Sequence, residues 1–238
     1  MATVVITGVS RGLGAELFAQ VHADGHRVVG IGRRFSDAQH KLAAATPERV
    51  ELHEADLARP ATLPDREILA SRLAGTTHAA LIHNAGVVEP IGAVGTLPDA
   101  QLATSVTVNL TAPMVLTNAF LAALPEAAAA TILFISSGAA HRPVDGWAAY
   151  SSAKRGGEAF FDAIAAQVAD QPRIRVANVN PAVMDTGMQA AIRRAAAGDS
   201  WFPDRGRFVA LHADGQLPDP ATVAGRILAE HLGAEGRH

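Results

Sequence analysis

The chain contains no cysteine among its 238 residues, which excludes a disulfide framework and any metal site built from thiolates. It has ten histidines, but they form no metal-binding pattern. His22 and His26 are four apart, yet Gly25 lies between them where a helix should end, and no third ligand is spaced to join them. We therefore expect no metal, and a cysteine-free chain fits the reducing cytoplasm.

Long apolar runs and a strong charge are also absent. No run of eighteen apolar residues occurs, so we expect no membrane span. The formal net charge of −3 gives no electrostatic reason to expect nucleic acid or an anionic membrane surface as partner. Thr3 to Thr7 already reads as a strand, so we expect no signal segment ahead of it. With 49% hydrophobic residues, the chain can bury one large core, and we predict a single domain over 1–238.

Short apolar or β-branched runs alternate with stretches rich in alanine and leucine along the whole chain. This alternation is typical of a parallel sheet covered by helices on both faces. We predict an α/β fold, a doubly wound Rossmann-type domain with strand order 3-2-1-4-5-6. The six predicted strands are Thr3–Thr7, Arg27–Gly32, Val50–His53, His78–His83, Thr131–Ser136 and Ile174–Asn180. The predicted helices include Val106–Leu124, interrupted by Pro113, Ala149–Ala169 and Ala221–Leu232, and the alanine run 127–130 is interpreted as a helix end.

A glycine-rich turn, Thr7 to Gly14, directly follows the first strand and opens a helix. Glycines there allow a tight turn and close approach of the backbone to a phosphate, whose charge is favoured by the helix N-terminus. Such a turn alone would be weak evidence, and a merely flexible loop is the alternative. In its strand–turn–helix context it predicts a dinucleotide site. The predicted contacts are Gly8, Ser10, Arg11, Gly12, Leu13 and Gly14.

The second strand ends in Gly32-Arg33-Arg34, at the distance beyond Gly14 where an NAD site usually places an acidic residue for the ribose hydroxyls. Arginine there suits the 2′-phosphate of NADP(H) instead, and Arg11 adds a second guanidinium. We therefore predict NADP(H) as cofactor. The alternative is that Arg33 and Arg34 are solvated loop charges.

The only tyrosine, Tyr150, stands four residues before Lys154, which places both side chains on one face of a helix. A neighbouring cation favours phenolate and lowers the pKa of a phenol, so such a tyrosine can hand a proton to a carbonyl oxygen. Ser137 follows a strand, where its hydroxyl could bond the same oxygen. The alternative is an ordinary surface pair, since this spacing alone is common.

Three other regions complete the pattern. Asp56-Leu57 and Asn84-Ala85-Gly86 follow predicted strands at carboxyl ends, where ligands lie in open α/β sheets. Asn109 lies inside a predicted helix, a place where Asn is usually solvent-facing or locally hydrogen-bonded. The segment 188–218 is long enough to be a substrate loop or lid. Candidate substrate contacts are Trp147, Met188, Trp201, Phe202 and Phe208, for which ordinary packing is an equal alternative.

Together these motifs resemble the short-chain dehydrogenase/reductase family over nearly the whole chain. The matching residues are Thr7 to Gly14, Asp56-Leu57, Asn84-Ala85-Gly86, Asn109, Ser137, Tyr150 with Lys154, and Pro181 to Thr186. The resemblance implies a catalytic tetrad of Asn109, Ser137, Tyr150 and Lys154, in which Lys154 also grips the nicotinamide ribose and Asn109 positions a water. It further implies cofactor contacts from Asp56, Leu57, Asn84, Ala85, Gly86, Tyr150, Lys154, Pro181, Val183 and Thr186.

Within the family, the segments around Ser137, Tyr150 and Thr186 look most like the sepiapterin reductase and benzil reductase branch. The resemblance implies an NADPH-dependent carbonyl reductase for a small aryl ketone or 1,2-diketone. Alternatives are a pterin reductase, or a sensor that binds NADP(H) without turnover.

Two departures from the family pattern stand out. Ala182 replaces a frequent glycine, and the usual seventh strand has no counterpart. The acidic anchor for a pterin lies in that missing region, which disfavours a pterin substrate. A second subunit interface also uses that strand, so we expect a homodimer through the helices 106–124 and 149–169. Gly156 and Gly157 would allow close helix approach, between subunits or within one.

Overall fold

Six parallel strands form the middle layer of the molecule in the order β3-β2-β1-β4-β5-β6. The computed structural model describes residues 1–194 and 205–233. The strands are β1 (Thr3–Thr7), β2 (Arg27–Gly32), β3 (Val50–Glu54), β4 (His78–His83), β5 (Ala129–Ile135) and β6 (Ile174–Val179). The predicted fold class and strand order are therefore confirmed, as are the strand positions to within one or two residues.

One prediction near β5 is wrong. The alanine run 127–130 was predicted to end a helix, but Ala129 and Ala130 begin β5 and pair with His78 and Ala79 of β4. Alanine favours a helix by intrinsic propensity, but that preference is under 1 kcal/mol per residue relative to most other residues. The hydrogen bonds to two neighbouring strands outweigh it at this position.

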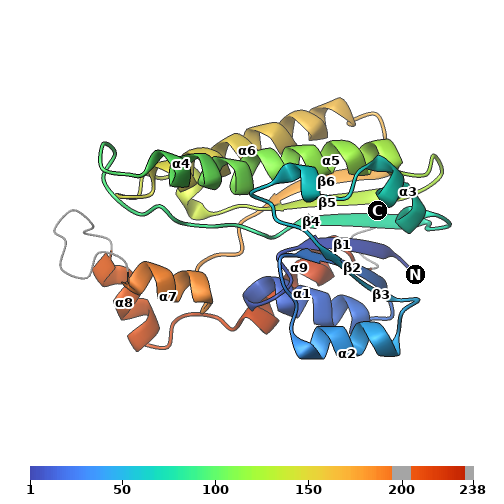
Figure 1. Cartoon of the computed structure of the whole chain (residues 1–238), viewed down its shortest axis with the longest axis horizontal. Helices are drawn as coiled ribbons and strands as arrows, with labels where there is room; N and C mark the ends of the chain where they lie inside the picture. The colour runs from blue at the N-terminus through green and yellow to red at the C-terminus, as the bar shows by residue number, and fades with distance from the viewer. Residues whose placement is uncertain (195–204, 234–238) are drawn as a thin grey trace.

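Helices cover both faces of the sheet (Figure 1). One face carries α1 (Gly12–Ala23), α2 (Asp37–Ala45) and α9 (Pro220–His231), and the other carries α3 (Arg66–Leu73), α4 (Asp99–Val106), α5 (Ala112–Ala123) and α6 (Ala148–Gln167). Leu17 and Ile227 are buried on the first side, and Leu69, Phe120 and Phe161 on the second. Each such side chain contributes about 1.5–3 kcal/mol by leaving water.

Two further helices, α7 (Gly187–Arg194) and α8 (Arg205–Ala213), lie together beyond one end of the sheet, apart from both covering layers (Figure 1). They belong to the segment 188–218 that the sequence singled out as a loop or lid. Asp185 faces both helices, because its carboxylate lies 3.8 Å from Arg193 and 3.6 Å from the ring of His212.

The helix predicted over 106–124 is longer and less regular than expected. It runs from Asp99 to Ala123, with a π-helical turn, Thr107–Thr111, between α4 and α5. Pro113 lacks the N–H that a regular α-helix would direct at the carbonyl of Asn109, so the helix cannot keep standard geometry there. Among the described residues, this helix alone is long and apolar enough by composition to pass as a membrane span. Leu116 and Phe120 are nevertheless buried in the core with α3 and α6, as in the core helix of a globular domain.

Both glycines in the middle of α6, Gly156 and Gly157, serve packing within the subunit. A Cβ on Gly157 would lie 2.3 Å from the Phe134 ring, and one on Gly156 would lie 3.3 Å from Leu110. The close approach that they permit is thus between α6 and its own β5 and π turn.

Candidate active site

Hydrogen bonds from the Asn84 side chain hold the glycine-rich turn against the end of β4. The Asn84 amide Nδ2 donates to the carbonyl oxygens of Thr7 and Gly8, at 3.0 and 3.1 Å. A Cβ on Gly14 would lie 2.2 Å from the oxygen of Gly8 and 2.3 Å from that Nδ2. No side chain fits at position 14, because the turn and the Asn84 carboxamide already fill the space.

Thr7 ties the same two segments together from the other side. Its hydroxyl accepts hydrogen bonds from the backbone N–H groups of Asn84 and Ala85, each at 3.1 Å. A Cβ on Gly8, whose φ is +74°, would lie 2.8 Å from the Cα of Ala85. The predicted cofactor residues of the turn and of the β4 end therefore form one unit.

The start of α1 offers a site for a phosphate. Arg11 is the N-cap residue, its side chain makes no capping hydrogen bond, and the first turn of α1 holds no acidic residue. The N–H groups at this end are therefore available to an anion, and the helix dipole favours one. The backbone-lined turn with Gly12 at φ +56° leaves room for close approach. These residues fit the pyrophosphate of a dinucleotide.

Three exposed arginines surround this region. Within residues 1–194 and 205–233, no acidic side chain pairs with Arg11, Arg33 or Arg34. Arg33 and Arg34 follow β2, and the guanidinium of Arg11 lies 3.7 Å from where a Cβ on Gly187 would be. Arg11 thus spans from the glycine turn to the first residue of α7.

The other predicted cofactor residues lie at the same carboxyl edge. Leu57 is buried after β3, while the Asp56 carboxylate accepts from the N–H of Ala58 at 3.1 Å and pairs with Arg59 at 3.4 Å. After β6, Val183 packs against the apolar cluster that contains Tyr150, and Pro181 is buried. Thr186 Cγ2 would lie 3.3 Å from a Cβ on Gly12, so the segment after β6 faces the glycine turn.

Ala182, which stands where the family often has glycine, has a φ of +64°. This left-handed conformation costs an L-residue with a Cβ roughly 1–2 kcal/mol. The backbone here keeps the conformation that glycine would adopt freely. The N–H of Ala182 donates to the side-chain oxygen of Asn180 at 3.1 Å.

Tyr150 and Lys154 lie in the first turns of α6, and both are buried. The Lys154 ammonium donates to the carbonyl oxygen of Ile135 at 2.7 Å and lies 4.6 Å from the centre of the Phe134 ring. It lies 5.9 Å from the centre of the Tyr150 ring. The Lys154 ammonium therefore lies between the Tyr150 ring and the end of β5, where it is hydrogen-bonded to the Ile135 carbonyl.

Burial dominates the acid–base properties of this pair. It lowers the pKa of Lys154 to about 8, although the charge of Glu158 partly opposes the change. It raises the pKa of Tyr150, and a side-chain hydrogen bond with Ser137 partly opposes that. The predicted lowering of the tyrosine pKa by Lys154 is absent, because the ammonium is directed at Ile135 and the phenol is shielded from water.

Ser137 and Asn109 join the tyrosine and lysine. Ser137 caps the short 3₁₀ helix η3 (Gly138–Ala140) and is the hydrogen-bond partner of Tyr150. A Cβ on Gly86 would lie 3.0 Å from Asn109 Oδ1 and 3.6 Å from Lys154 Nζ, so these two polar groups meet at Gly86. The structure thus brings together all four predicted catalytic residues.

The Asn109 carboxamide is held by hydrogen bonds on both its nitrogen and its oxygen. Its oxygen accepts from the N–H of Val87 at 3.1 Å, and its nitrogen donates to the carbonyls of Val87 and Ser105 at 2.8 and 2.9 Å. The sequence analysis noted the interruption at Pro113 but did not predict the π turn at Asn109.

An apolar cluster covers Tyr150, which is only 5% exposed. Trp147 stacks on Phe208 of α8 at 5.4 Å between ring centres and meets Tyr150 edge-on at 5.7 Å. Met188 packs against the same cluster. Three of the predicted substrate residues are thus gathered over the tyrosine, whereas Trp201 and Phe202 lie outside the described residues. The cluster also contains residues that the sequence analysis missed: Val88, Ile91, Ala139, Val144 and Ile192.

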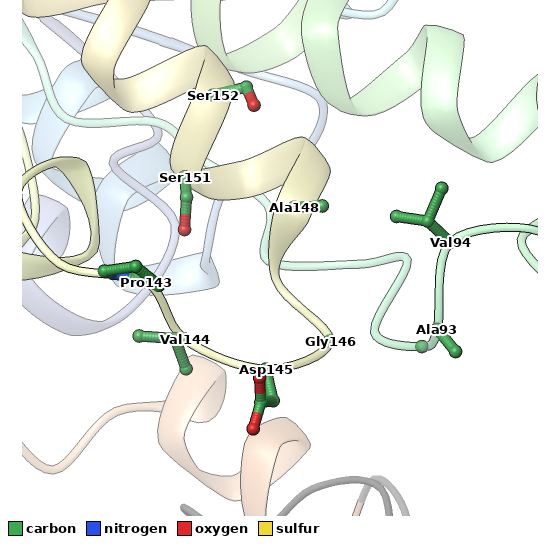
Figure 2. Close-up of a pocket in the computed structure, with 10 residues that line it drawn as sticks. Ala93, Val94, Pro143, Val144, Asp145, Gly146, Ala148, Ser151 and Ser152 are labelled. Atoms are coloured by element: carbon green, nitrogen blue, oxygen red, sulfur yellow. The ribbon is translucent and has the colours of Figure 1, made fainter.

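A cavity of about 430 Å³ lies at the start of α6 and shares Val144 with this cluster (Figure 2). Ala148, Ser151 and Ser152 line it together with the loops Gly92–Val94 and Pro143–Gly146. Because successive helical residues are about 100° apart, Ala148 and Ser152 lie about 200° around α6 from Tyr150, and Ser151 lies about 100° from it. The residues given for its lining include none of the four predicted catalytic residues. Among the described residues, no three His, Asp or Glu side chains are placed to hold a metal ion.

Comparison with known proteins shows the family of this chain. The family model for short chain dehydrogenases matches residues 2–197. A benzil reductase ((S)-benzoin forming) from Bacillus cereus is 34% identical over 232 residues, covering 95% of this chain and 92% of the relative. A sepiapterin reductase from Meriones unguiculatus is 31% identical over 244 residues, covering 95% and 90%. The crystal structure of the KRED1-Pglu enzyme superposes with a TM-score of 0.84 at 31% identity, covering 98% of this chain and 95% of that one.

Proposed function

Because the chain belongs to the short-chain dehydrogenase family, whose members act on C=O and CH–OH groups, we propose that it is an NADPH-dependent reductase of small aryl ketones or 1,2-diketones. One observation carries the proposal. Tyr150 is hydrogen-bonded to Ser137, lies next to the buried Lys154 and is part of an apolar cluster. A carbonyl placed there meets a proton donor on an otherwise apolar surface.

The reduced nicotinamide, when bound, supplies the hydride. The protein supplies the proton and the geometry. Tyr150 donates from its phenol oxygen to the carbonyl oxygen, and Ser137 donates a second hydrogen bond to that oxygen. Lys154, whose ammonium lies 5.9 Å from the centre of the Tyr150 ring, would grip the ribose of the bound nicotinamide. The high pKa of Tyr150 in the free protein keeps the phenol protonated and ready to donate.

The glycine turn and the exposed arginines support the cofactor assignment. The open N-terminus of α1 would hold the pyrophosphate, with Thr186 on the facing segment. Arg33 and Arg34 would hold the 2′-phosphate, since no described acidic side chain neutralises them. Arg11 would act from the turn itself, between this site and α7.

The substrate class follows from the lining of the cluster. Its members other than Tyr150 are aliphatic or aromatic, with Trp147 and Phe208 stacked face to face. Such a surface favours a neutral, flat substrate, because a charged group would lose its hydration there without a partner. A substrate ring could occupy the position against Trp147 that Phe208 holds in this structure. The benzil reductase relatives are named for a substrate of this kind.

The test is NADPH oxidation by the purified protein against a panel of benzil, aryl ketones, aldehydes, pterins and acyl thioesters. We expect the highest kcat/KM with the diketone or an aryl ketone. Tyr150→Phe keeps the ring but removes the donor, and should lower kcat by at least about 10²–10⁴-fold while cofactor binding persists. Ser152→Ala, on the exposed side of the same helix, is the control. Near-normal turnover by the Phe variant would refute the mechanism, and NADPH binding without turnover on any substrate would favour a sensor.

We also propose a homodimer formed through the Asp99–Ala123 helix and α6. Val106 and Val115 of that helix are 39% and 42% exposed, which is high for apolar side chains on a helix that is otherwise partly buried. Light scattering at micromolar concentration should give twice the chain mass, and Val115→Arg should give the monomer. A tetramer would contradict the proposal.

A further inference from the structure

A buried carboxylate with no place in this mechanism lies next to Lys154. Glu158 follows it by one turn of α6, and its side chain is 8% exposed. The hydroxyl of Ser136 donates to Glu158 Oε1 at 2.6 Å, and Nε2 of His141 lies 3.0 Å from Oε2. Arg155 Nη1 lies 3.7 Å from the same oxygen.

The carboxylate contacts the segments that carry two catalytic residues. Ser136 immediately precedes Ser137 at the end of β5, and its N–H is fixed by the carbonyl of Val179 at 2.8 Å. Lys154 is at i−4 from Glu158, on the same face of α6. The direct partners of the lysine ammonium, the Ile135 carbonyl and the Phe134 ring, carry no formal charge. The anion on the adjacent turn therefore provides formal charge balance for a buried cation.

We propose that Glu158 is a positioning residue that keeps Lys154 in its ammonium form and fixes the β5 end that carries Ser137. The proposal rests on the proposed function only insofar as Lys154 serves Tyr150. Its electrostatic part concerns the free protein and can be measured without turnover.

The charged groups around Glu158 leave its negative charge free to act on Lys154. His141 is 59% exposed and Arg155 lies largely in solvent, so water screens their hold on the carboxylate. On the β6 side, Asn178 donates to Asp162 at 2.7 Å and to the main-chain oxygen of Glu158 at 3.3 Å.

On the β4 side of Lys154, His83 carries no competing charge at neutral pH. Burial and the positive charge of Lys154 lower its pKa to about 3. Burial lowers the pKa of Lys154, whereas the charge of Glu158 raises it.

The chain has only two lysines, Lys41 and Lys154, which makes a direct test simple. Protein labelled with [ε-¹³C]lysine gives two signals, and Lys41, which is exposed, serves as internal reference. In Glu158→Gln the amide retains the shape and can still accept from Ser136, but the charge is gone. The titration midpoint of Lys154 should fall by about one pH unit, as expected for losing an opposite charge one helical turn away.

The matched control is Asp162→Asn, which removes the same charge from the next turn of α6 and should leave the Lys154 midpoint unchanged. The acid–base pH profile of kcat/KM should move with the Lys154 midpoint in Glu158→Gln alone. A midpoint equal to that of the wild type, or an equal shift in Asp162→Asn, would overturn the proposal. Failure of every carbonyl substrate would refute the proposed function but leave the lysine titration valid.

If Glu158→Gln does not fold, the double variant Glu158→Gln/Lys154→Met decides. Removing the cation that the carboxylate balances should restore folding, as measured by circular dichroism. If the double variant is also unfolded, Glu158 is needed for the structure alone and the electrostatic role is refuted.

Discussion

Replacing Lys154 by methionine should separate the stability of this protein from its activity. The folded pKa of Lys154 is about 8, against 10.5 for an ordinary lysine. The unfolded chain therefore binds more protons than the folded one between these values, so wild-type stability rises with pH across that window. Burying the charged form destabilises the fold by about 3 kcal/mol at pH 7, at 1.36 kcal/mol per pKa unit. That destabilisation is present in full below pH 8 and disappears above pH 10.5.

Methionine fills a similar volume and does not titrate. Relative to Lys154→Met, the wild type should thus gain about 2.5 kcal/mol of unfolding free energy between pH 7 and pH 10. At pH 7 the variant loses the hydrogen bond to Ile135, which costs about 1–3 kcal/mol, and leaves the buried Glu158 carboxylate without the cation that it balances, so these losses offset the relief of the buried charge at that pH. Its reductase activity should be lost.

The assay is urea unfolding of both proteins at several pH values from 7 to 10, with Lys41→Met as the control for an exposed lysine. Effects of other titrating groups cancel in the difference between wild type and variant. The Lys41 variant should track the wild type throughout. A difference between wild type and Lys154→Met that is constant over this pH range would refute the assignment of a depressed lysine pKa.

Two further predictions concern cofactor choice and backbone strain. Two charge-assisted contacts to a 2′-phosphate, weakened by solvent exposure and salt, imply about 10²–10³-fold preference for NADPH over NADH in kcat/KM. Arg33→Asp should invert this preference. Equal use of NADH by the wild type at fixed ionic strength would contradict the assignment. Ala182→Gly relieves the left-handed strain at the cost of about 0.5–1 kcal/mol of backbone entropy, so the unfolding free energy should change by between zero and about +1.5 kcal/mol. Ala163→Gly on the exposed face of α6 should lose about 1 kcal/mol, and equal losses in the two variants would mean that position 182 is unstrained.

The sequence predicted best those structural features that a local residue pattern determines. Buried parallel strands are continuous apolar runs, so β1, β2 and β4 could be placed to the residue. The spacing of Tyr150 and Lys154 placed both on one face of α6. The same spacing could not show that the ammonium turns to the Ile135 carbonyl, because this depends on how deeply β5 and α6 pack together. The direction of the tyrosine pKa was therefore predicted wrongly.

Features that join distant segments were not predictable. Glu158 meets His141 across a loop whose path depends on the 3₁₀ turn after Ser137. The π turn at Asn109 arises from Pro113 within a tertiary environment that holds the helix together on both sides. The aromatic contact of Trp147 with Phe208 could be suspected from composition, but only the placement of α8 over the cluster decided it.

The lock between Gly14 and Asn84 has an evolutionary consequence. The amide of Asn84 fills the volume that a side chain at position 14 would need, and it reaches the oxygens of Thr7 and Gly8 because that volume is empty. A mutation at either position alone removes the benefit of the other: any residue at 14 displaces the amide, and a shorter residue at 84 leaves two carbonyls without their donor. A side chain at position 14 therefore requires a compensating substitution at position 84, although three strands of the sheet lie within the sequence between the two positions.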